Sequence, residues 1–537
     1  MPNDRSYDVV VLGTGASGLC AALAAADAGA DVAVFEKSQL VGGTTALSSG
    51  VAWIPNNKYA AAVGVRDSRA DALAYLQSLS FDMIVPELAE ALVDTGPELI
   101  DWLESSTPLR LRLIPGFPDY HPEHPGGMPQ GGRSLEPELF SFSAIEGWGA
   151  RMVGTTRPMR VTETPIGGGT GVLDPEVEAD RRSQQIEGLG RALVGSLLKG
   201  CLDRGVVPHL EHRAVALVML GGAVDGVTFE TPQGSVAIRA RSVVIATGGF
   251  EFDQELVRAF LRGPIKHPAG VPTNTGDGLR MAMRVGAQLG NMREAWWVPV
   301  AALPKENPDD RQPVLLILRE RTLPRSIIVN RFGRRFTNEA ANYNALGGAF
   351  HQFDPTSFSY LNQPCHLLFD QGFVDRYGGF GTAAGGPAPE WALRAATLEE
   401  LATLIGVPAD ALVATVERFN DMVAKGHDED FRRGESAHDG WGGDRTRYPT
   451  AAATLGPLDA GPFYAVELFS STLGTKGGPR TDVDGRVLDV DGVPIPGLYA
   501  AGNAMAGPTG MVYGGAGGTL GPALVFGYRA GRRAARA

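Results

Sequence analysis

The chain has 537 residues, a formal net charge of −12 and an isoelectric point near 5.3, a balance that disfavours binding to nucleic acid or to an anionic membrane surface. Its three cysteines, Cys20, Cys201 and Cys365, are far apart, so their spacing indicates neither a disulfide framework nor a metal or dithiol site. The length allows two or three domains, and the 71 glycines, about twice the average share, suit a backbone that approaches an extended ligand.

The first predicted unit spans residues 9–36: a strand, a turn with Gly13, Gly15 and Gly18, an Ala/Leu-rich helix, and a second strand that ends at Glu36. The first glycine allows the tight turn, the second lets the backbone approach a pyrophosphate, and the third lets helix and strand pack closely. The helix N-terminus then faces phosphate charge, and Glu36 would accept hydrogen bonds from an adenosine ribose. The complete unit predicts a dinucleotide-binding site.

Four later segments indicate that the dinucleotide is FAD. Residues 42–50 offer small and hydroxyl side chains that can cover a diphosphate and the flavin edge. The predicted strands in 242–249 and 496–503 both run into glycine, as strands do where their carboxyl ends meet a ligand, and Asn503 is placed to hydrogen-bond a ribityl hydroxyl. A helix that begins near 518–520 would direct its positive end to the pyrimidine side of the flavin.

The order of these segments is similar to that in flavoproteins of the glutathione-reductase-like class. The predicted FAD-binding residues are Gly13, Gly15, Ala16, Ser17, Gly18, Glu36, Lys37, Gly43, Thr44, Thr45, Ser49, Gly50, Val215, Thr247, Gly248, Gly502, Asn503 and Leu520.

Between residues 294 and 462 the alternation of glycines and strands lapses, and it resumes from Tyr464 to the end. We therefore predict an α/β fold in which a glutathione-reductase-like Rossmann FAD-binding domain, residues 1–293 and 463–537, is interrupted by an α+β catalytic cap domain, residues 294–462. Substrate would bind between the two domains, because interdomain crevices bind ligands of this size.

Residues 9–26 are apolar enough to be mistaken for a signal-peptide core or a membrane span. The glycine pattern and Asp8 argue against both, and only one arginine precedes the apolar run. We expect a cytoplasmic protein without a transmembrane segment, and peripheral membrane contact through an exposed apolar loop stays open.

Three segments, residues 328–339, 473–482 and 501–503, resemble the succinate dehydrogenase/fumarate reductase flavoprotein superfamily. A fourth, YGGAGGTLGPAL at 513–524, is similar to the closing motif of 3-ketosteroid Δ1-dehydrogenases. The likeness covers nearly the whole chain. It implies an FAD-dependent 1,2-desaturation of 3-ketosteroids, in which a proton leaves C2 for a tyrosine base and a hydride leaves C1 for flavin N5.

The resemblance also implies roles for four residues. In that family a tyrosine hydroxyl and a backbone amide hold the ketone oxygen, a second tyrosine takes the proton, and a third assists the second. Matched residue by residue, Tyr513 is the donor, Gly517 the amide, Tyr343 the base and Tyr120 the assistant. A tyrosine base starts from a pKa near 10, so it needs help, and a neighbouring phenol that donates to its oxygen is one source.

Two further pairs of residues allow more than one interpretation. His121 and His124 have HxxH spacing in a proline-rich loop, where a solvated loop is more frequent than a metal pair, and we predict no metal site. Trp296 and Trp297 could wall an apolar steroid pocket or pack in the core.

Several alternatives remain for the function. Gly514 and Gly518 stand where Pro or Ala is more often expected, which leaves the regiochemistry open. A 3-ketosteroid Δ4-(5α)-dehydrogenase, another flavin ketone desaturase or enone reductase, a fumarate-reductase-like enzyme and a non-catalytic flavin-fold binding protein are the other candidates. The fumarate-reductase-like candidate would need Arg and His where this chain has tyrosines. Because no second dinucleotide motif occurs, we do not expect NAD bound on this chain to reoxidise the flavin, and the external electron acceptor is unknown.

Overall fold

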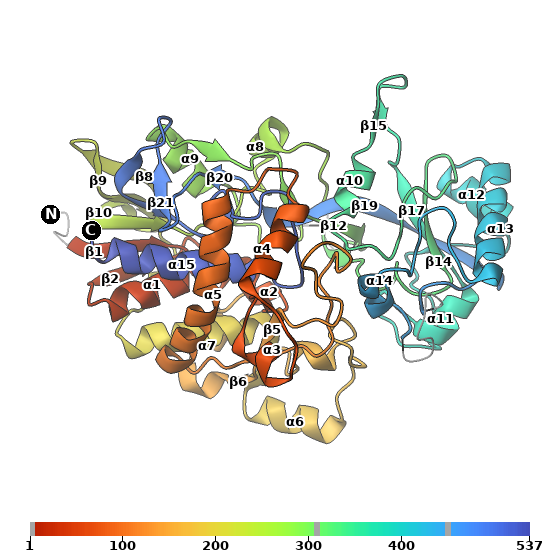
Figure 1. Cartoon of the computed structure of the whole chain (residues 1–537), viewed down its shortest axis with the longest axis horizontal. Helices are drawn as coiled ribbons and strands as arrows, with labels where there is room; N and C mark the ends of the chain where they lie inside the picture. Colours follow the sequence, from red (N-terminus) through yellow and green to blue (C-terminus); the bar gives the residue numbers. More distant parts are fainter. Residues whose placement is uncertain (1–5, 306–311, 446–452) are drawn as a thin grey trace.

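The computed structural model describes residues 6–305, 312–445 and 453–537. Figure 1 shows two lobes, with strands β12 (Ala295–Ala302) and β19 (Phe463–Thr475) lying between them. The larger lobe contains both ends of the described chain, and the smaller lobe is formed from its middle.

The larger lobe is built on a seven-stranded sheet with the order β2-β1-β10-β22-β21, to which the β8–β9 hairpin is joined through β9. Strand β1 pairs in parallel with β2 and β10, and β10 pairs in parallel with β22. The strands are β1 (Ser6–Leu12), β2 (Val32–Phe35), β8 (Arg213–Leu220), β9 (Ala223–Thr231), β10 (Gly234–Ile245), β21 (Arg486–Leu488) and β22 (Pro494–Ala500). Strands β1 and β2 are apolar because helices cover them.

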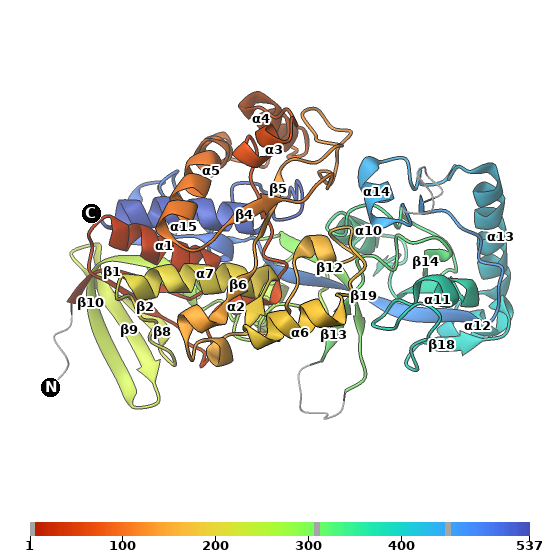
Figure 2. The ribbon, with the colours of Figure 1, turned by 90° about the horizontal axis from the view of Figure 1, so that it is seen from below.

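Helices α1 (Ala16–Asp27) and α15 (Leu520–Ala534) lie side by side in both views (Figures 1 and 2). Glycines allow this close approach: a Cβ atom at Gly527 would lie 2.5 Å from the carbonyl oxygen of Ser17, and one at Gly531 would lie 2.1 Å from that of Ala21. Helix α7 (Leu189–Asp203) packs on α1, and α5 (Pro86–Ser106) packs on α15. Because β1, β10 and β22 run parallel, their carboxyl ends share one edge of the sheet, and α1 begins at this edge, just after β1.

The smaller lobe contains a six-stranded sheet with the order β13-β12-β19-β17-β14, in which β18 also pairs with β19. The strands not yet given are β13 (Val314–Leu316), β14 (Ser326–Asn330), β17 (Cys365–Asp370) and β18 (Leu393–Ala395). Helices α12 (Leu398–Ile405) and α13 (Ala409–Lys425) bury their apolar sides against residues of β14, β17 and β19. In Figure 2, β19 runs out of this sheet toward the larger lobe.

The remaining elements are short. They are α2 (Gly43–Leu47), β3 (Ala52–Trp53), α3 (Lys58–Ala62), α4 (Arg69–Ser78), β4 (Leu111–Leu113), β5 (Ser134–Pro137), β6 (Phe140–Ser141), α6 (Pro175–Ser183), β7 (Ile186–Glu187), α8 (Gln254–Phe260), α9 (Asp277–Arg284), β11 (Leu289–Gly290), α10 (Leu346–Phe350), β15 (Phe353–Asp354), β16 (Ser359–Tyr360), α11 (Gln371–Tyr377), α14 (Ala437–Gly442) and β20 (Gly478–Pro479).

The predicted α/β class is confirmed by this arrangement, in which helices cover a mixed sheet whose strands β2, β1, β10 and β22 are parallel. The domain limits stay a proposal. Strand β19 begins at Phe463, just after the proposed cap, and still pairs with β12 and β17 of the cap sheet. Within the described ranges, no helix combines the length and the apolar character that a bilayer span requires.

Candidate active site

The turn between β1 and α1 has the geometry expected of a pyrophosphate site. Gly13 has φ +106°, and a Cβ atom there would lie 2.4 Å from the carbonyl oxygen of Ala246. A Cβ atom at Gly18 would lie 2.1 Å from the carbonyl oxygen of Gly13, whereas one at Gly15 would meet only the Thr45 hydroxyl, at 3.5 Å. Gly15, the residue before α1, has no side chain to cap the helix, so the N–H groups that follow that of Ala16 can bind an anion.

Glu36 is buried at the end of β2 and holds the same turn. Its Oε2 accepts hydrogen bonds from the backbone N–H and the hydroxyl of Thr14, at 3.1 and 2.7 Å, and its Oε1 accepts one from the N–H of Ser38 at 3.0 Å. A carboxylate can accept about four hydrogen bonds. One acceptor position therefore remains for a ribose hydroxyl.

Other predicted cofactor residues gather around this turn. The Thr45 hydroxyl accepts a hydrogen bond from the N–H of Ala16 at 3.1 Å, and a Cβ atom at Gly502 would lie 2.5 Å from the Ser17 hydroxyl. The Thr44 hydroxyl instead accepts from Asn274 Nδ2 at 3.1 Å.

The remaining predicted cofactor residues lie near the ends of elements or in a strand. Gly43 begins α2, Ser49 and Gly50 come just after this helix, Thr247 and Gly248 follow β10, and Leu520 begins α15. The Lys37 ammonium donates hydrogen bonds to the side chains of Thr275 and Asp277. The backbone carbonyl of Val215, in β8, accepts a hydrogen bond from the Arg284 guanidinium. Their contacts with a cofactor stay predictions.

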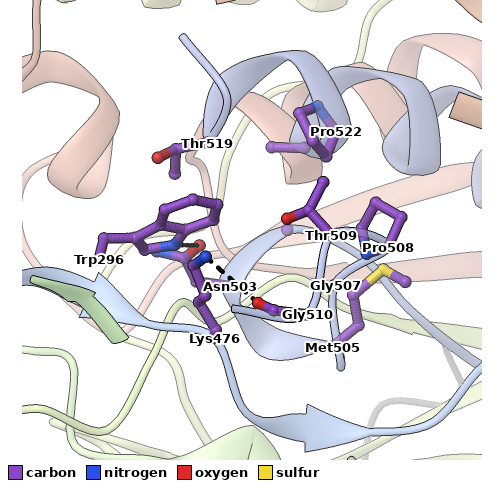
Figure 3. A pocket seen from close by; sticks show the side chains of 12 residues that line it. Trp296, Lys476, Asn503, Met505, Gly507, Pro508, Thr509, Gly510, Thr519 and Pro522 are labelled. Atoms are coloured by element: carbon purple, nitrogen blue, oxygen red, sulfur yellow. Dashed lines mark hydrogen bonds between the residues drawn. The ribbon is translucent and has the colours of Figure 1, made fainter. Parts of the chain in front are cut away.

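A small pocket lies beside Gly502 and the start of α15. Figure 3 shows Trp296, Asn503 and Lys476 together on its wall, with Thr519 from the start of α15 above them. The Lys476 ammonium lies 3.9 Å from the centroid of the Trp296 ring, and burial lowers the pKa of this lysine to about 7. The side-chain Oδ1 of Asn503 accepts a hydrogen bond from the indole N–H of Trp296 at 2.9 Å. The side chain predicted to bind a ribityl hydroxyl therefore contacts a tryptophan in this structure.

The three predicted catalytic tyrosines form one cluster. The Tyr120 hydroxyl donates to the Tyr343 hydroxyl at 3.1 Å, and the Tyr343 hydroxyl donates to the Tyr513 hydroxyl at 2.9 Å. The ring centroids are 5.1 to 5.5 Å apart, although the bonded residues are separated by 223 and 170 positions in sequence. The fold therefore brings together three hydroxyls from three different segments.

The cluster lies in an apolar environment. Its neighbours include Val51, Ile114, Phe117, Leu189, Trp296 and Ala516. Burial raises the pKa of Tyr120 and of Tyr343 well above the usual range, and it also raises the pKa of Tyr513. All three phenols are therefore neutral at rest, and a negative charge on one of them needs a compensating donor or cation nearby.

Gly517 lies beside Tyr513 in a backbone conformation that favours glycine, with φ +91°. A Cβ atom there would lie 2.5 Å from the backbone nitrogen of Trp53, whose N–H donates to the Gly517 carbonyl at 3.0 Å. Among the described residues, the Gly517 N–H has no hydrogen-bond acceptor. This N–H can therefore bind a ligand oxygen, as the predicted role requires.

Polar contacts fix the three tyrosine segments relative to one another. The Gly514 carbonyl accepts the backbone N–H of Tyr120 at 2.8 Å and the Tyr75 hydroxyl at 2.6 Å. His121, which follows Tyr120 in the chain, donates its backbone N–H to the Tyr75 hydroxyl at 3.0 Å. Its ring Nε2 lies 2.7 Å from Asn342 Nδ2. The Tyr120 segment is thus tied both to the Tyr513 segment and to the Tyr343 segment.

The His121, Glu123 and His124 side chains lie close enough to share a metal ion, with ligand atoms within 4.8 Å of one another. However, the Asn342 carbonyl accepts the backbone N–H groups of residues 344–345 at 2.9 and 3.0 Å, so its NH₂ group faces His121. His121 Nε2 must then accept, which places the proton of the neutral ring on Nδ1, the nitrogen that a metal would need. We therefore assign His121 to positioning the tyrosine loops.

Sequence reasoning missed several residues around the cluster. Trp53 donates its indole N–H to buried Asp119 at 2.8 Å, His438 packs edge-on against Tyr120 at a centroid distance of 4.9 Å, and Arg321 is buried nearby. Of these residues, only Asp119 could have been found from the sequence, because it directly precedes the predicted site residue Tyr120.

Known proteins are similar to this chain over almost its whole length. The FAD binding domain family matches residues 8–520. A 4-oxocyclohexanecarboxylate 2-dehydrogenase of Sinomonas cyclohexanicum is 42% identical, over 98% of this chain and 92% of the relative. A 3-oxosteroid 1-dehydrogenase of Mycobacterium tuberculosis strain H37Rv is 38% identical, over 98% of both chains.

A solved structure of a steroid dehydrogenase is also similar to this chain. The 3-ketosteroid Δ1-dehydrogenase from Sterolibacterium denitrificans, in complex with 1,4-androstadiene-3,17-dione, superposes with a TM-score of 0.91 at 33% identity and covers 99% of this chain and 100% of its own. The predicted resemblance and the predicted cofactor are confirmed. This chain belongs to the FAD binding domain family and is an FAD-dependent oxidoreductase.

Proposed function

We propose that this protein catalyses the FAD-dependent 1,2-desaturation of 3-ketosteroids. The observation that carries the proposal is the chain of three tyrosine hydroxyls, from buried Tyr120 and Tyr513 and partly buried Tyr343, beside the available N–H of Gly517. A 3-oxosteroid 1-dehydrogenase at 38% identity and the steroid-bound structure with a TM-score of 0.91 support a steroid as the substrate.

The ketone oxygen is bound by two donors. A proton at the carbon beside a ketone becomes acidic only if negative charge can move onto the ketone oxygen, so donors at that oxygen lower the barrier. The Tyr513 hydroxyl and the Gly517 N–H are the groups that supply these hydrogen bonds. The apolar wall around the cluster strengthens them, because little water competes for the oxygen.

The C2 proton is taken by Tyr343. The α-carbon and the ketone oxygen are separated by only two bonds, so the groups that address them must be adjacent, and the Tyr343 and Tyr513 hydroxyls are 2.9 Å apart. Tyr120 donates to the Tyr343 oxygen and stabilises its ionised form, since a donor to a charged oxygen favours the charge. When bound, FAD supplies the acceptor for the hydride that leaves C1.

The residues that would hold FAD are those of the β1–α1 turn, Glu36, α2, the end of β10 and the start of α15. The open space beside Gly15 and the remaining acceptor position on Glu36 fit the diphosphate and the ribose.

A second substrate class is favoured by one observation. The relative at 42% identity is named for 4-oxocyclohexanecarboxylate, a single ring with a ketone and a carboxylate. Removal of hydrogen beside a ring ketone needs the same donors and the same base, so the tyrosine cluster suits both substrates. The residues that contact the rest of the substrate, away from the ketone, would decide between the two substrate classes.

Steady-state turnover with a dye as electron acceptor separates the two classes. We expect kcat/KM to be at least about tenfold higher for a 3-keto-4-ene steroid than for 4-oxocyclohexanecarboxylate, because each additional buried apolar carbon adds binding free energy. The opposite order assigns the protein to the small keto acid. A 5α-reduced steroid desaturated at C4–C5, with 4-ene steroids untouched, assigns it to the Δ4-(5α) class, and absence of turnover with all three substrates refutes the proposal.

A dye is proposed as the acceptor for assays because the chain shows one dinucleotide motif, which the flavin uses. A cytoplasmic location stays a prediction.

A further inference from the structure

Arg321 lies in the turn between β13 and β14 and is 2% exposed. Its Nε donates to the carbonyl of Ile317 at 3.1 Å, and its Nη1 donates to the carbonyls of Glu339 and, at 2.6 Å, Ala341. The last two carbonyls belong to the segment that leads directly into Tyr343. The guanidinium therefore fixes the backbone that carries the proposed base.

Arg321 forms no direct ion pair. Of the residues that the structure describes, no carboxylate lies within 4 Å of its guanidinium, whereas each of the other buried arginines has one. Those arginines are Arg133, Arg191, Arg335 and Arg433. A buried cation without a direct ion pair is costly to keep, and a negative charge that forms nearby during turnover would offset part of that cost.

The charged and titratable groups around Arg321 include one carboxylate, that of Asp439, whose negative charge acts on the guanidinium from beyond ion-pair distance. The positive charge acts on the phenols of Tyr120 and Tyr343. Burial and the charge of Arg321 lower the pKa of His438 to about 3, so this imidazole is neutral. Asp439 accepts hydrogen bonds from Asn338 Nδ2 at 2.9 Å and from a backbone N–H, and Arg433 is paired with Glu339.

We propose that Arg321 is a positioning residue that stabilises the ionised form of Tyr343. It acts in two ways: its hydrogen bonds hold the segment before Tyr343, and its positive charge favours a phenolate in the apolar cluster. This inference rests on the proposed function for the role of Tyr343 as a base. The proton balance is simple, since ionised Tyr343 accepts the α-proton of the ketone and becomes a neutral phenol.

Two substitutions separate the charge from the hydrogen bonds. Arg321→Gln keeps NH₂ donors but removes the charge, and Arg321→Lys keeps the charge. Arg319→Met, two residues earlier and partly exposed, is the matched control. Each FAD-loaded protein is assayed for turnover between pH 6 and 10, and its thermal midpoint and FAD content are recorded.

We expect the midpoint of the rising pH–rate profile to move up by at least about one unit in Arg321→Gln, with turnover at pH 7 reduced tenfold or more and the loss shrinking as pH rises. Arg321→Lys should recover most of the loss, and Arg319→Met should behave like the unchanged protein. A loss in Arg321→Gln that is the same at every pH, or no loss at all, overturns the proposal.

A second readout needs no substrate. A 3,5-difluorotyrosine placed at position 343 ionises in a lower pH range than tyrosine, and ¹⁹F NMR of the FAD-loaded protein follows its titration. Its midpoint should rise in Arg321→Gln and return in Arg321→Lys; an unchanged midpoint contradicts the proposal even if turnover falls. If no ketone is turned over but the midpoint shifts as expected, the proposed function has failed and the charge coupling stands.

Discussion

The β1–α1 turn and the tyrosine cluster use the chain in different ways. The turn acts through backbone groups, and what matters there is the space that Gly15 leaves open between two closely packed glycines. The cluster acts through three side-chain hydroxyls that reach one another from distant segments. A substitution in the turn therefore blocks a space or breaks the packing, whereas Tyr→Phe in the cluster removes one oxygen and leaves the shape intact. The two regions can be tested separately.

The largest effect is expected at Gly15. Its φ of −70° is accessible to any residue, and a Cβ atom would contact only Thr45, so Gly15→Val should fold yet occupy the proposed pyrophosphate space. We expect no bound FAD after purification and no turnover. Gly348→Val, at an exposed glycine with open space around it, is the control and should keep FAD. Flavin absorbance and thermal unfolding are the measurements, and one FAD per chain in Gly15→Val would contradict the assignment.

Tyr343→Phe should give the second largest effect, since it removes the proposed base. We expect turnover to fall by about a thousandfold at neutral pH, while FAD content and the thermal midpoint are retained. Stopped-flow flavin reduction measures the chemical step directly. Wild-type-like reduction in this variant would show that another group takes the proton.

Tyr513→Phe removes one of the two proposed donors to the ketone oxygen. Because the Gly517 N–H remains, we expect a loss of about a hundredfold in kcat with a smaller change in substrate binding. Comparison of kcat with the Kd of a non-reacting ketone steroid distinguishes these effects. An equal loss in binding and in kcat would show that Tyr513 binds the substrate without favouring the transition state.

Tyr120→Phe should give the smallest effect of the three, because it removes only a donor to a base that is still present. Burial raises the pKa of Tyr343, so at neutral pH few molecules hold it ionised, and the donor matters most there. We expect a loss of about tenfold at pH 7 that shrinks as pH rises toward the pKa of the base. A defect of constant size across pH would identify Tyr120 as a packing residue.

The nucleotide-binding unit could be predicted from sequence because its parts are local. The glycines, the helix and Glu36 lie within about thirty residues, and backbone sterics relate each to its role. The cap was less predictable. Strand β19 begins just after the proposed cap boundary, yet it pairs with β12 and β17 of the cap sheet. These pairings join residues that are far apart in sequence, so no local sequence pattern predicts them.

The tyrosine cluster could be predicted only through family resemblance. Nothing in the spacing of Tyr120 and Tyr343 indicates that their hydroxyls meet, because the contact depends on how two loops fold back. The contact between His121 and Asn342, and the carbonyl partners of Arg321, depend on the same loops. For His121 the sequence suggested a possible metal pair, and only the hydrogen bonds of Asn342 exclude that role for its Nδ1.

The most direct measurement is a single anaerobic turnover. The FAD-loaded protein is mixed without an electron acceptor with a 3-keto-4-ene steroid or with 4-oxocyclohexanecarboxylate, while the flavin absorbance is followed and the product is identified. We predict rapid bleaching with the steroid and a product that carries one new double bond between C1 and C2, beside the ketone. A flavin that stays oxidised with both substrates, or a product whose new double bond is not conjugated with the ketone, would contradict the proposed chemistry.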